Sequence, residues 1–168
     1  VTTANQQDAE KALHAIQTEI ARLDQILSVW RDDSEISQLN REQKISASSE
    51  LYDVIAACEQ WRSATCGGFD ARLGQLISLW ENSNQVQKLD DQTQEALLQQ
   101  LKTQSIELNP QTKQITLTPA IKVAPDAYAK GYVIDRALVA AQQAVPHLQG
   151  ILIDIGGDMR VWGQSPQQ

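Results

Sequence analysis

Apolar residues recur at helical spacing in the first third of the chain. Between residues 6 and 27 they form one stripe, which predicts an amphipathic helix with a buried face: Leu13, Ile16, Ile20, Leu23 and Leu27. A second stripe follows Ser49, with Glu50 in the first turn, and predicts a helix that ends near the glycine pair at 67–68: Leu51, Val54, Ile55, Cys58 and Trp61.

Polar residues mark where shorter helices begin. Residues 32–34 (Asp-Asp-Ser) can cap a short helix at Glu35, and a capped loop is the simplest interpretation of that segment. Asp91, with Gln94 three residues later, resembles an N-terminal cap and predicts a further helix. That helix continues through Leu97, Leu98 and Leu101.

Two stretches alternate with the period of a β-strand. Residues 106–117 hold two short alternating runs around Asn-Pro-Gln-Thr, which predicts a β-hairpin with one apolar face: Ile106, Leu108, Ile115 and Leu117. Residues 151–155 alternate isoleucine with Leu152 and Asp154 and predict another strand. Gly156 and Gly157 then suit a two-residue hairpin turn.

A helix is also predicted just before that strand. Pro125 fits its first position, where a missing N–H costs nothing, and Asp126 suits the positive end of the helix dipole. Its apolar stripe is Ala129, Tyr132, Val133, Ala137 and Ala140. Lys130 lies one turn inside, where free N–H groups and the dipole favour phosphates. From the residues alone, the alternative is a lysine in solvent.

Asp154 and Asp158 flank the glycine turn. Two carboxylates so placed can serve acid–base chemistry or hold a metal. Aspartate is also common at hairpin ends, where its side chain stabilises the turn. Both interpretations stay open at this point.

The composition narrows the class of protein. The chain has 168 residues, 42% of them hydrophobic and 21% charged, which suits one globular domain with a sizeable core. A net charge of −7 argues against nucleic acid as a partner, because that binding needs clustered Lys and Arg. No apolar run approaches the roughly 20 residues that span a bilayer. The two cysteines, with no Cys or His cluster around them, do not indicate a zinc site.

Three groups of residues occur in an order and spacing that is hard to obtain by chance. They are residues 27–37 (Leu-Ser-Val-Trp-Arg-Asp-Asp-Ser-Glu-Ile-Ser) with 39–40 (Leu-Asn), residues 68–70 (Gly-Phe-Asp) with 79–80 (Leu-Trp), and residues 129–132 (Ala-Lys-Gly-Tyr) with 135–136 (Asp-Arg) and 154–158 (Asp-Ile-Gly-Gly-Asp). Together they resemble the ApbE family of flavin transferases (FAD:protein FMN transferases) over about residues 27–163.

The resemblance implies a binding site for FAD. In the family an aromatic residue, usually tyrosine, contacts the flavin nucleotide where Trp30 stands, and tryptophan can stack on a planar ring equally well. The family binds FAD with the backbone and side chains of a triplet that matches Gly68, Phe69 and Asp70. Beyond the triplet this chain departs from the family, which usually has Thr and Pro where Arg72 and Gln75 stand.

The resemblance implies three further site positions around the last motif. Lys130 matches a lysine near the phosphates. Ala127 stands where the family offers a backbone carbonyl to Mg²⁺, and a backbone ligand tolerates any side chain. Ala124 stands where the family commonly has an acidic residue, and Asp126 can replace that acid only if the loop shifts.

The resemblance also implies an activity and a fold. The family cleaves the phosphoanhydride of FAD with Mg²⁺ as cofactor, esterifies the FMN half onto a Thr or Ser hydroxyl of an acceptor protein, and releases AMP. We expect residues 1–168 to form a single α+β domain, with helices packed on a mainly antiparallel sheet, that is the amino-terminal portion of such a transferase. The catalytic histidine and the Asp and Thr side chains that hold Mg²⁺ belong to a carboxy-terminal portion absent from this chain, so its own catalytic residues are unknown.

Partners and location follow from the same resemblance. The expected partner is a flavin-acceptor protein, and the chain lacks the acceptor pattern itself, an Asp followed by Ser or Thr and Gly-Ala-Thr. Family members are exported, often lipid-anchored proteins, so we expect the periplasm or the periplasmic side of the inner membrane. The start at Val1 suggests a processed or trimmed chain, and the sequence itself indicates no compartment.

Two alternatives stay open. The first is a non-catalytic flavin-binding or electron-transfer scaffold protein, which the missing acid at Ala124 favours. The second is a structural domain that binds no nucleotide. Trp30 and Lys130 discriminate between these hypotheses, because flavin binding needs both residues and folding needs neither.

Overall fold

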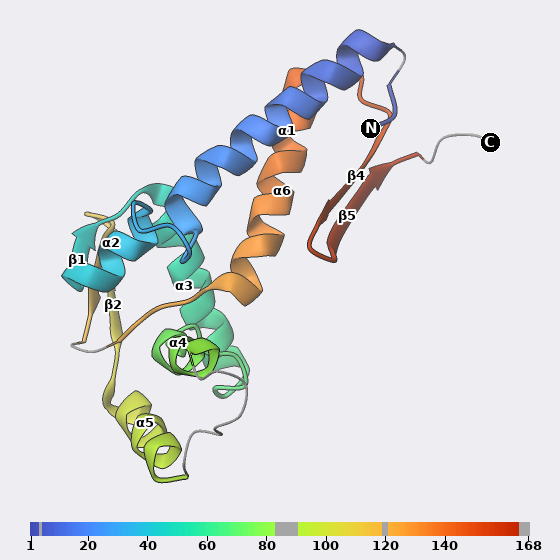
Figure 1. The fold of residues 1–168 in the computed structure, drawn as a ribbon. Helices are drawn as coiled ribbons and strands as arrows, with labels where there is room; N and C mark the ends of the chain where they lie inside the picture. The colour runs from blue at the N-terminus through green and yellow to red at the C-terminus, as the bar shows by residue number, and fades with distance from the viewer. Residues whose placement is uncertain (4, 83–90, 119–120, 165–168) are drawn as a thin grey trace. The chain divides into compact units, whose positions relative to one another are not determined.

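The computed structural model describes residues 1–3, 5–82, 91–118 and 121–164. The chain divides into two compact units (Figure 1). One unit comprises Val1–Gln25 with Ala127–Gln168, and the other comprises Ile26–Asp126. Both combine helices with antiparallel strands, as the α+β class predicts.

The first unit is built from two long helices and a hairpin. These are α1 (Gln6–Leu27), α6 (Asp126–Ala144), β4 (Gly150–Ile155) and β5 (Asp158–Gly163). The bounds of α1 are those predicted, whereas α6 begins one residue after Pro125. The two helices lie side by side, and β4 and β5 pair antiparallel next to α6 (Figure 1).

The core of this unit joins both helices to β4. Its buried side chains are Ala12, Ile16, Ile134, Ala137, Leu138, Ala141, Val145, Leu148, Ile151 and Ile153. The predicted stripe of α6 is therefore partly wrong: Ile134 and Leu138 are buried, whereas Val133 is only half-buried. Leu13 of α1 is 49% exposed, because Ala12 and Ile16, four residues apart, set the buried face.

The turn between β4 and β5 has the geometry that its sequence predicts. Gly156 and Gly157 have φ angles of 61° and 94°, and two positive φ angles are the requirement of a type I′ turn. The Asp154 carboxylate accepts the N–H of Gly157 at 2.9 Å. Asp154 therefore stabilises the turn.

The second unit contains four helices and a three-stranded sheet in the described part of the chain. Its elements are α2 (Glu35–Glu42), β1 (Lys44–Ser46), α3 (Ser49–Ala64), α4 (Gly74–Asn82), α5 (Asp91–Thr103), β2 (Ile106–Asn109) and β3 (Gln114–Leu117). The strand order is β1-β3-β2, and both pairings are antiparallel. The predicted hairpin is confirmed, with Ile106 opposite Leu117 and Leu108 opposite Ile115 on one apolar face.

Side-chain caps fix the starts of α2 and α3. Ser34 accepts the N–H of Ser37 and caps α2, as predicted. Ser48, one residue before the expected start, caps α3. Glu35 accepts both the N–H and the hydroxyl of Ser48 at 2.6 Å, which ties the two helix starts together.

One residue of the predicted apolar stripe of α3 is exposed instead. Trp61 is 53% exposed. Trp61 lies in the last turn of α3, beyond the buried residues that end at Cys58. The predicted cap of α5 rests on the side chains of Asp91 and Gln94, which lie outside the described residues, as does the side chain of Trp80.

Candidate functional site

Trp30 lies in the turn between α1 and α2, and it is 74% exposed. The turn is held from both sides. The hydroxyl of Ser34 donates to the carbonyl of Ser28 at 2.7 Å, and the guanidinium of Arg41 donates to the carbonyl of Asp32 at 2.7 Å. A fixed backbone with an exposed indole suits stacking on a planar ring.

The other end of α2 fixes the segment that carries Ala124. The side-chain amide of Asn40 donates to the carbonyl of Val123 at 2.9 Å and accepts its N–H at 2.7 Å. Asn40 thus pairs with Val123 as a neighbouring strand would, and it positions the chain just before α6.

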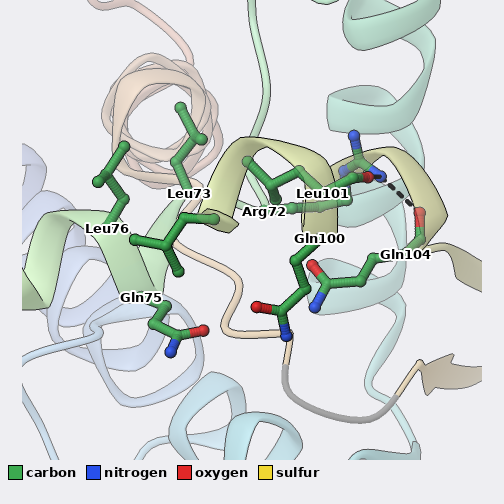
Figure 2. Close-up of a pocket in the computed structure, with 8 residues that line it drawn as sticks. Arg72, Leu73, Gln75, Leu76, Gln100, Leu101 and Gln104 are labelled. Carbon is green, nitrogen blue, oxygen red and sulfur yellow. Dashed lines mark hydrogen bonds between the residues drawn. The ribbon is translucent and has the colours of Figure 1, made fainter. Parts of the chain in front are cut away.

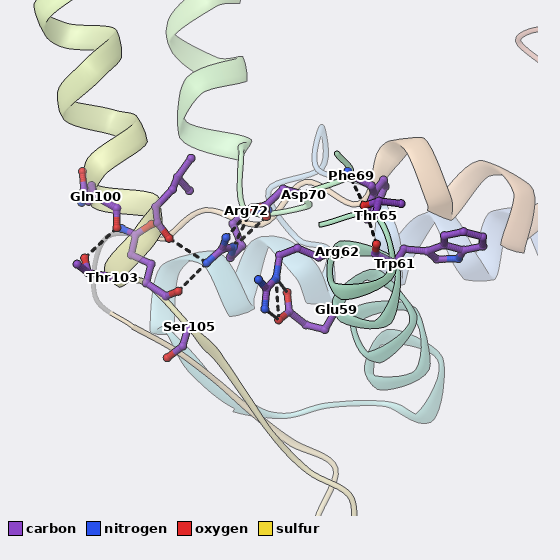
Figure 3. A network of polar contacts seen from close by, with 12 residues as sticks. Glu59, Trp61, Arg62, Thr65, Phe69, Asp70, Arg72, Gln100, Thr103 and Ser105 are labelled. Carbon is purple, nitrogen blue, oxygen red and sulfur yellow. Dashed lines mark hydrogen bonds and ion pairs between the residues drawn. The ribbon is translucent and has the colours of Figure 1, made fainter. Parts of the chain in front are cut away.

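The triplet at 68–70 follows α3 and is tied to its end. The N–H of Gly68 donates to the carbonyl of Thr65 at 3.0 Å, and the N–H of Phe69 donates to the Thr65 hydroxyl at 2.9 Å (Figure 3). That hydroxyl in turn donates to the carbonyl of Trp61 at 2.7 Å. The start of the triplet is therefore fixed by hydrogen bonds to the last turn of α3.

Asp70 forms a buried ion pair with Arg72 (Figure 3). One carboxylate oxygen accepts the backbone N–H and the Nε of Arg72, both at 2.9 Å, and the other accepts Nη2 at 2.6 Å. The two side chains are 11% and 9% exposed. Burial alone would raise the pKa of Asp70, but the hydrogen bonds and charge of Arg72, helped by Arg62, outweigh burial and lower it.

The remaining nitrogen of the Arg72 guanidinium reaches the end of α5. Nη1 donates to the carbonyls of Leu101 at 3.0 Å and Gln104 at 2.6 Å. These carbonyls have no helical partner, and a cation at a helix C-terminus is also favoured by the dipole. Arg72 therefore connects the triplet loop to α5.

The loop after the triplet lies directly against the segment before α6. The N–H of Ala124 donates to the carbonyl of Ala71 at 2.8 Å, and the N–H of Gly74 donates to the carbonyl of Lys122 at 3.1 Å. A Cβ at Gly74 would stand 2.7 Å from the Lys122 oxygen, so this approach requires glycine. The structure thus brings Ala124 beside the triplet loop.

A cleft of about 410 Å³ opens beside these segments. Its lining residues are Asn40, Gln43, Gln75, Ser78, Leu79, Ile121 and Lys122. Its volume is within the usual range for small-molecule sites. The side-chain oxygen of Gln43 is buried and, among the described residues, accepts no hydrogen bond, so it can accept one from a ligand or water.

A second cavity, between α4 and α5, has a volume of about 10 Å³ (Figure 2). It is lined by Arg72, Leu73, Gln75, Leu76, Leu97, Gln100, Leu101 and Gln104. That volume is enough for about one water molecule. The α5 side of Arg72 is therefore packing and not a ligand pocket.

Lys130 and Ala127 belong to the other unit, in the first turns of α6. The Lys130 ammonium lies 4.0 Å from the Asp158 carboxylate, and these side chains are 52% and 57% exposed. Ala127 is exposed as well. The structure thus joins Lys130 to the hairpin through a long ion pair that is open to solvent.

Ala127 is the predicted ligand for Mg²⁺, through its backbone carbonyl. Mg²⁺ demands near-octahedral oxygen coordination. Across residues 1–3, 5–82, 91–118 and 121–164, no group of three or more His, Cys, Asp or Glu side chains is placed to hold a metal. The carbonyl of Ala127 would supply one oxygen of such a set.

In the same described ranges, no helix has the length and apolar character of a membrane span.

Arg72 is the residue that sequence reasoning missed. The motifs mark Arg72 only as a departure from the family's threonine, although an arginine two residues after the aspartate of the triplet is a signal for an ion pair. Its helical partners could not be found in this way, because they are backbone carbonyls 29 and 32 residues away.

Comparison with known proteins places the chain in a family. The model of the ApbE family matches residues 1–168, so the chain belongs to the ApbE family, as the motifs predicted. No curated protein sequence matches the chain.

Solved structures share its fold. The ApbE protein of Thermotoga maritima is 22% identical, with a TM-score of 0.76 over 90% of this chain and 50% of that one. The flavinyl transferase ApbE of Pseudomonas stutzeri is 20% identical, with a TM-score of 0.77 over 94% and 54%. An H257G mutant of the flavin transferase ApbE of Vibrio cholerae is 20% identical, with a TM-score of 0.79 over 99% and 55%. The chain therefore spans about half the length of these structures.

Proposed function

We propose that the protein is an FAD:protein FMN transferase. The observation that carries this proposal is the family match over the whole of residues 1–168. In the reaction, the oxygen of a Thr or Ser hydroxyl on the acceptor protein bonds to the phosphorus of the FMN half. The bond from that phosphorus to the bridging oxygen breaks, AMP leaves with the bridging oxygen, and the hydroxyl proton is released.

The residues of this chain bind and position FAD. Trp30 stacks on a ring of the nucleotide, which its exposed indole supports. The loop at 68–70 contacts FAD next to Ala124, and the hydrogen bond between Ala71 and Ala124 supports a common site. Lys130 offsets charge on the phosphates, and its weak, exposed ion pair with Asp158 supports an ammonium that can change partners.

Mg²⁺ dependence and a location facing the periplasm are part of the same proposal. Both rest on the family alone. Ala127 would offer Mg²⁺ its backbone carbonyl, and the metal would offset charge on the phosphates of FAD.

The test is mass spectrometry of an acceptor peptide. The full-length protein is incubated with FAD, Mg²⁺ and a peptide with the pattern Asp-Thr-Gly-Ala-Thr, and the expected product is one covalent FMN per peptide. A peptide with valine for both threonines is the matched control and gains no FMN. An unmodified peptide, with intact FAD bound to the protein, would contradict transferase activity.

One observation favours a second candidate, a flavin-binding protein without transferase activity. The family's acidic residue is replaced by Ala124, whose methyl group offers no hydrogen bond to a nucleotide. This candidate predicts that FAD binds reversibly and remains uncleaved in the same experiment.

A further inference from the structure

Arg72 uses all three guanidinium nitrogens inside the protein. Nε and Nη2 bind the Asp70 carboxylate, and Nη1 binds the carbonyls of Leu101 and Gln104. With 9% of its side chain exposed, this arginine is a fixed part of the fold (Figure 3). The fork geometry of a guanidinium allows such simultaneous contacts, whereas an ammonium has no planar fork.

This arrangement changes what the triplet loop can offer a ligand. Both carboxylate oxygens of Asp70 are engaged by Arg72, and the N–H groups of Gly68 and Phe69 are engaged by Thr65. Among the described residues, no backbone N–H donates a hydrogen bond to the carbonyl oxygens of Gly68 and Phe69. The loop therefore presents acceptors, which match amino and hydroxyl groups of a nucleotide and not its phosphates.

We propose that Arg72 is a positioning residue for FAD binding: it locks Asp70 and the end of α5 together, so that the loop contacts the nucleotide through the carbonyls of Gly68 and Phe69 rather than through the Asp70 carboxylate. The proposal rests on the function proposed above. It differs from the family expectation, in which the side chains of the triplet also take part.

The charge of the pair supports this assignment. FAD carries two anionic phosphates, and an unpaired carboxylate in the binding loop would repel them. Arg72 neutralises Asp70 where it stands, and the backbone N–H of Arg72 also donates to the Asp70 carboxylate. Removing Arg72 leaves the buried carboxylate of Asp70 without its partner and the loop without its link to α5.

The first test measures FAD affinity by fluorescence titration of the full-length protein, well below its melting temperature. Arg72→Met is expected to weaken binding about tenfold, as for the loss of a net hydrogen bond or two. Arg72→Lys keeps the charge but loses the planar fork, so its affinity for FAD is expected to lie between those of the wild type and Arg72→Met. Lys113→Met is the control, because it removes an exposed ion pair with Asp53 in the same unit and is expected to leave affinity unchanged.

The second test is a double-mutant cycle with Asp70→Asn. If Arg72 acts through Asp70, Arg72→Met and Asp70→Asn are expected to weaken FAD binding by similar factors, and the double variant no more than either. Additive losses would overturn the proposal, because Asp70 would then contact FAD in its own right. Wild-type affinity in folded Arg72→Met would overturn it as well.

A third test needs no flavin. Hydrogen exchange of the amides in residues 66–73 is expected to accelerate in Arg72→Met and, less, in Arg72→Lys. It is compared with Ile115→Val, which loosens the buried core of the same unit without touching the loop. Unchanged exchange in both Arg72 variants would overturn the positioning role. If the wild type does not bind FAD, the proposed function is refuted. The exchange rates of residues 66–73 would still decide whether Arg72 positions the loop.

Discussion

The two units each hold an ion pair at a predicted FAD position, and the pairs differ in kind. Nη2 of Arg72 lies 2.6 Å from a carboxylate oxygen of Asp70, and the Asp70 and Arg72 side chains are 11% and 9% exposed. Lys130 and Asp158 are 4.0 Å apart, and more than half of each side chain is exposed. A buried pair with both partners fully hydrogen-bonded is costly to break, whereas an exposed pair contributes little and changes partners easily. We infer that the first pair shapes the site and that Lys130 of the second is available to a ligand.

The largest expected effect comes from breaking the buried pair. Arg72→Met leaves Asp70 and two carbonyls of α5 without their partner, so the free energy of unfolding is expected to fall by about 3–5 kcal/mol. Denaturant unfolding, monitored by circular dichroism, measures this change. Asp158→Asn breaks the exposed pair and is expected to change stability by less than about 0.5 kcal/mol. Equal losses in the two variants would contradict the comparison.

The next effect concerns Lys130 and ligand affinity. Lys130→Ala is expected to weaken FAD binding by roughly 1.5–3 kcal/mol, the range of a charge-assisted hydrogen bond. Its melting temperature is expected to hold or rise slightly, because alanine favours helix. The loss of affinity is expected to shrink as salt is raised.

The matched control for Lys130 is Lys11→Ala, on α1 in the same unit. Lys11 also forms an exposed ion pair, 3.7 Å from Asp8, but lies in no predicted site. Titrations and thermal melts of both variants at low and high salt separate a ligand contact from an ordinary surface lysine. Unaltered affinity of Lys130→Ala at low salt would make Lys130 an ordinary surface residue.

The pH dependence of stability sharpens the same contrast. The pKa of Asp70 is lowered by Arg72 against the opposing effect of burial. A carboxyl whose pKa is lower in the folded than in the unfolded state stabilises the fold above its ordinary pKa of about 4. That stability is lost as the pH falls through this range toward the lowered value. Asp70→Asn is therefore expected to flatten the fall in stability below about pH 4, and unfolding curves at pH 7, 4 and 3 compare it with the wild type.

Elements with long apolar stripes could be predicted from sequence, and short or tertiary ones could not. The stripe of α1 gave its bounds, and the glycine pair gave the turn between β4 and β5. β1 has three residues, too few for an alternating pattern, and it exists because β3 pairs with it. The stripe of α6 was misplaced by about one residue because alanines lie on several of its faces, and the contacts with α1 decide which face is buried.

In the candidate site, too, some features could be predicted from the sequence and others could not. Motifs identified Trp30, the triplet and Lys130 by residue type, and the structure adds how Asn40 and Ala71 fix the segment with Ala124. The link from Arg72 to α5 depends on backbone carbonyls, which every residue has and no sequence pattern marks. Roles in binding FAD stay predictions for all of these residues.

The smallest expected effect is a gain at Ala124, beside the buried pair. Its backbone is fixed by the hydrogen bond to Ala71, and Val123 before it is fixed by Asn40, so a new side chain at 124 would be held in place. Ala124→Asp restores the acid that family members commonly carry. One regained hydrogen bond is worth on the order of 1 kcal/mol, so FAD binding is expected to tighten several-fold.

Ala124→Asn, the matched control, supplies hydrogen-bonding groups without charge and is expected to recover only part of the gain, because bonds to charged groups are the stronger ones. Fluorescence titration of both variants with FAD measures the difference. Repulsion between a new carboxylate and the phosphates acts against the gain, and raising the salt concentration weakens that repulsion. A gain that grows with salt therefore indicates a hydrogen bond opposed by charge. Unchanged or weaker binding at every salt concentration would mean that Asp126 or another group already fills this role, and Asp126→Asn would then be the variant that loses affinity.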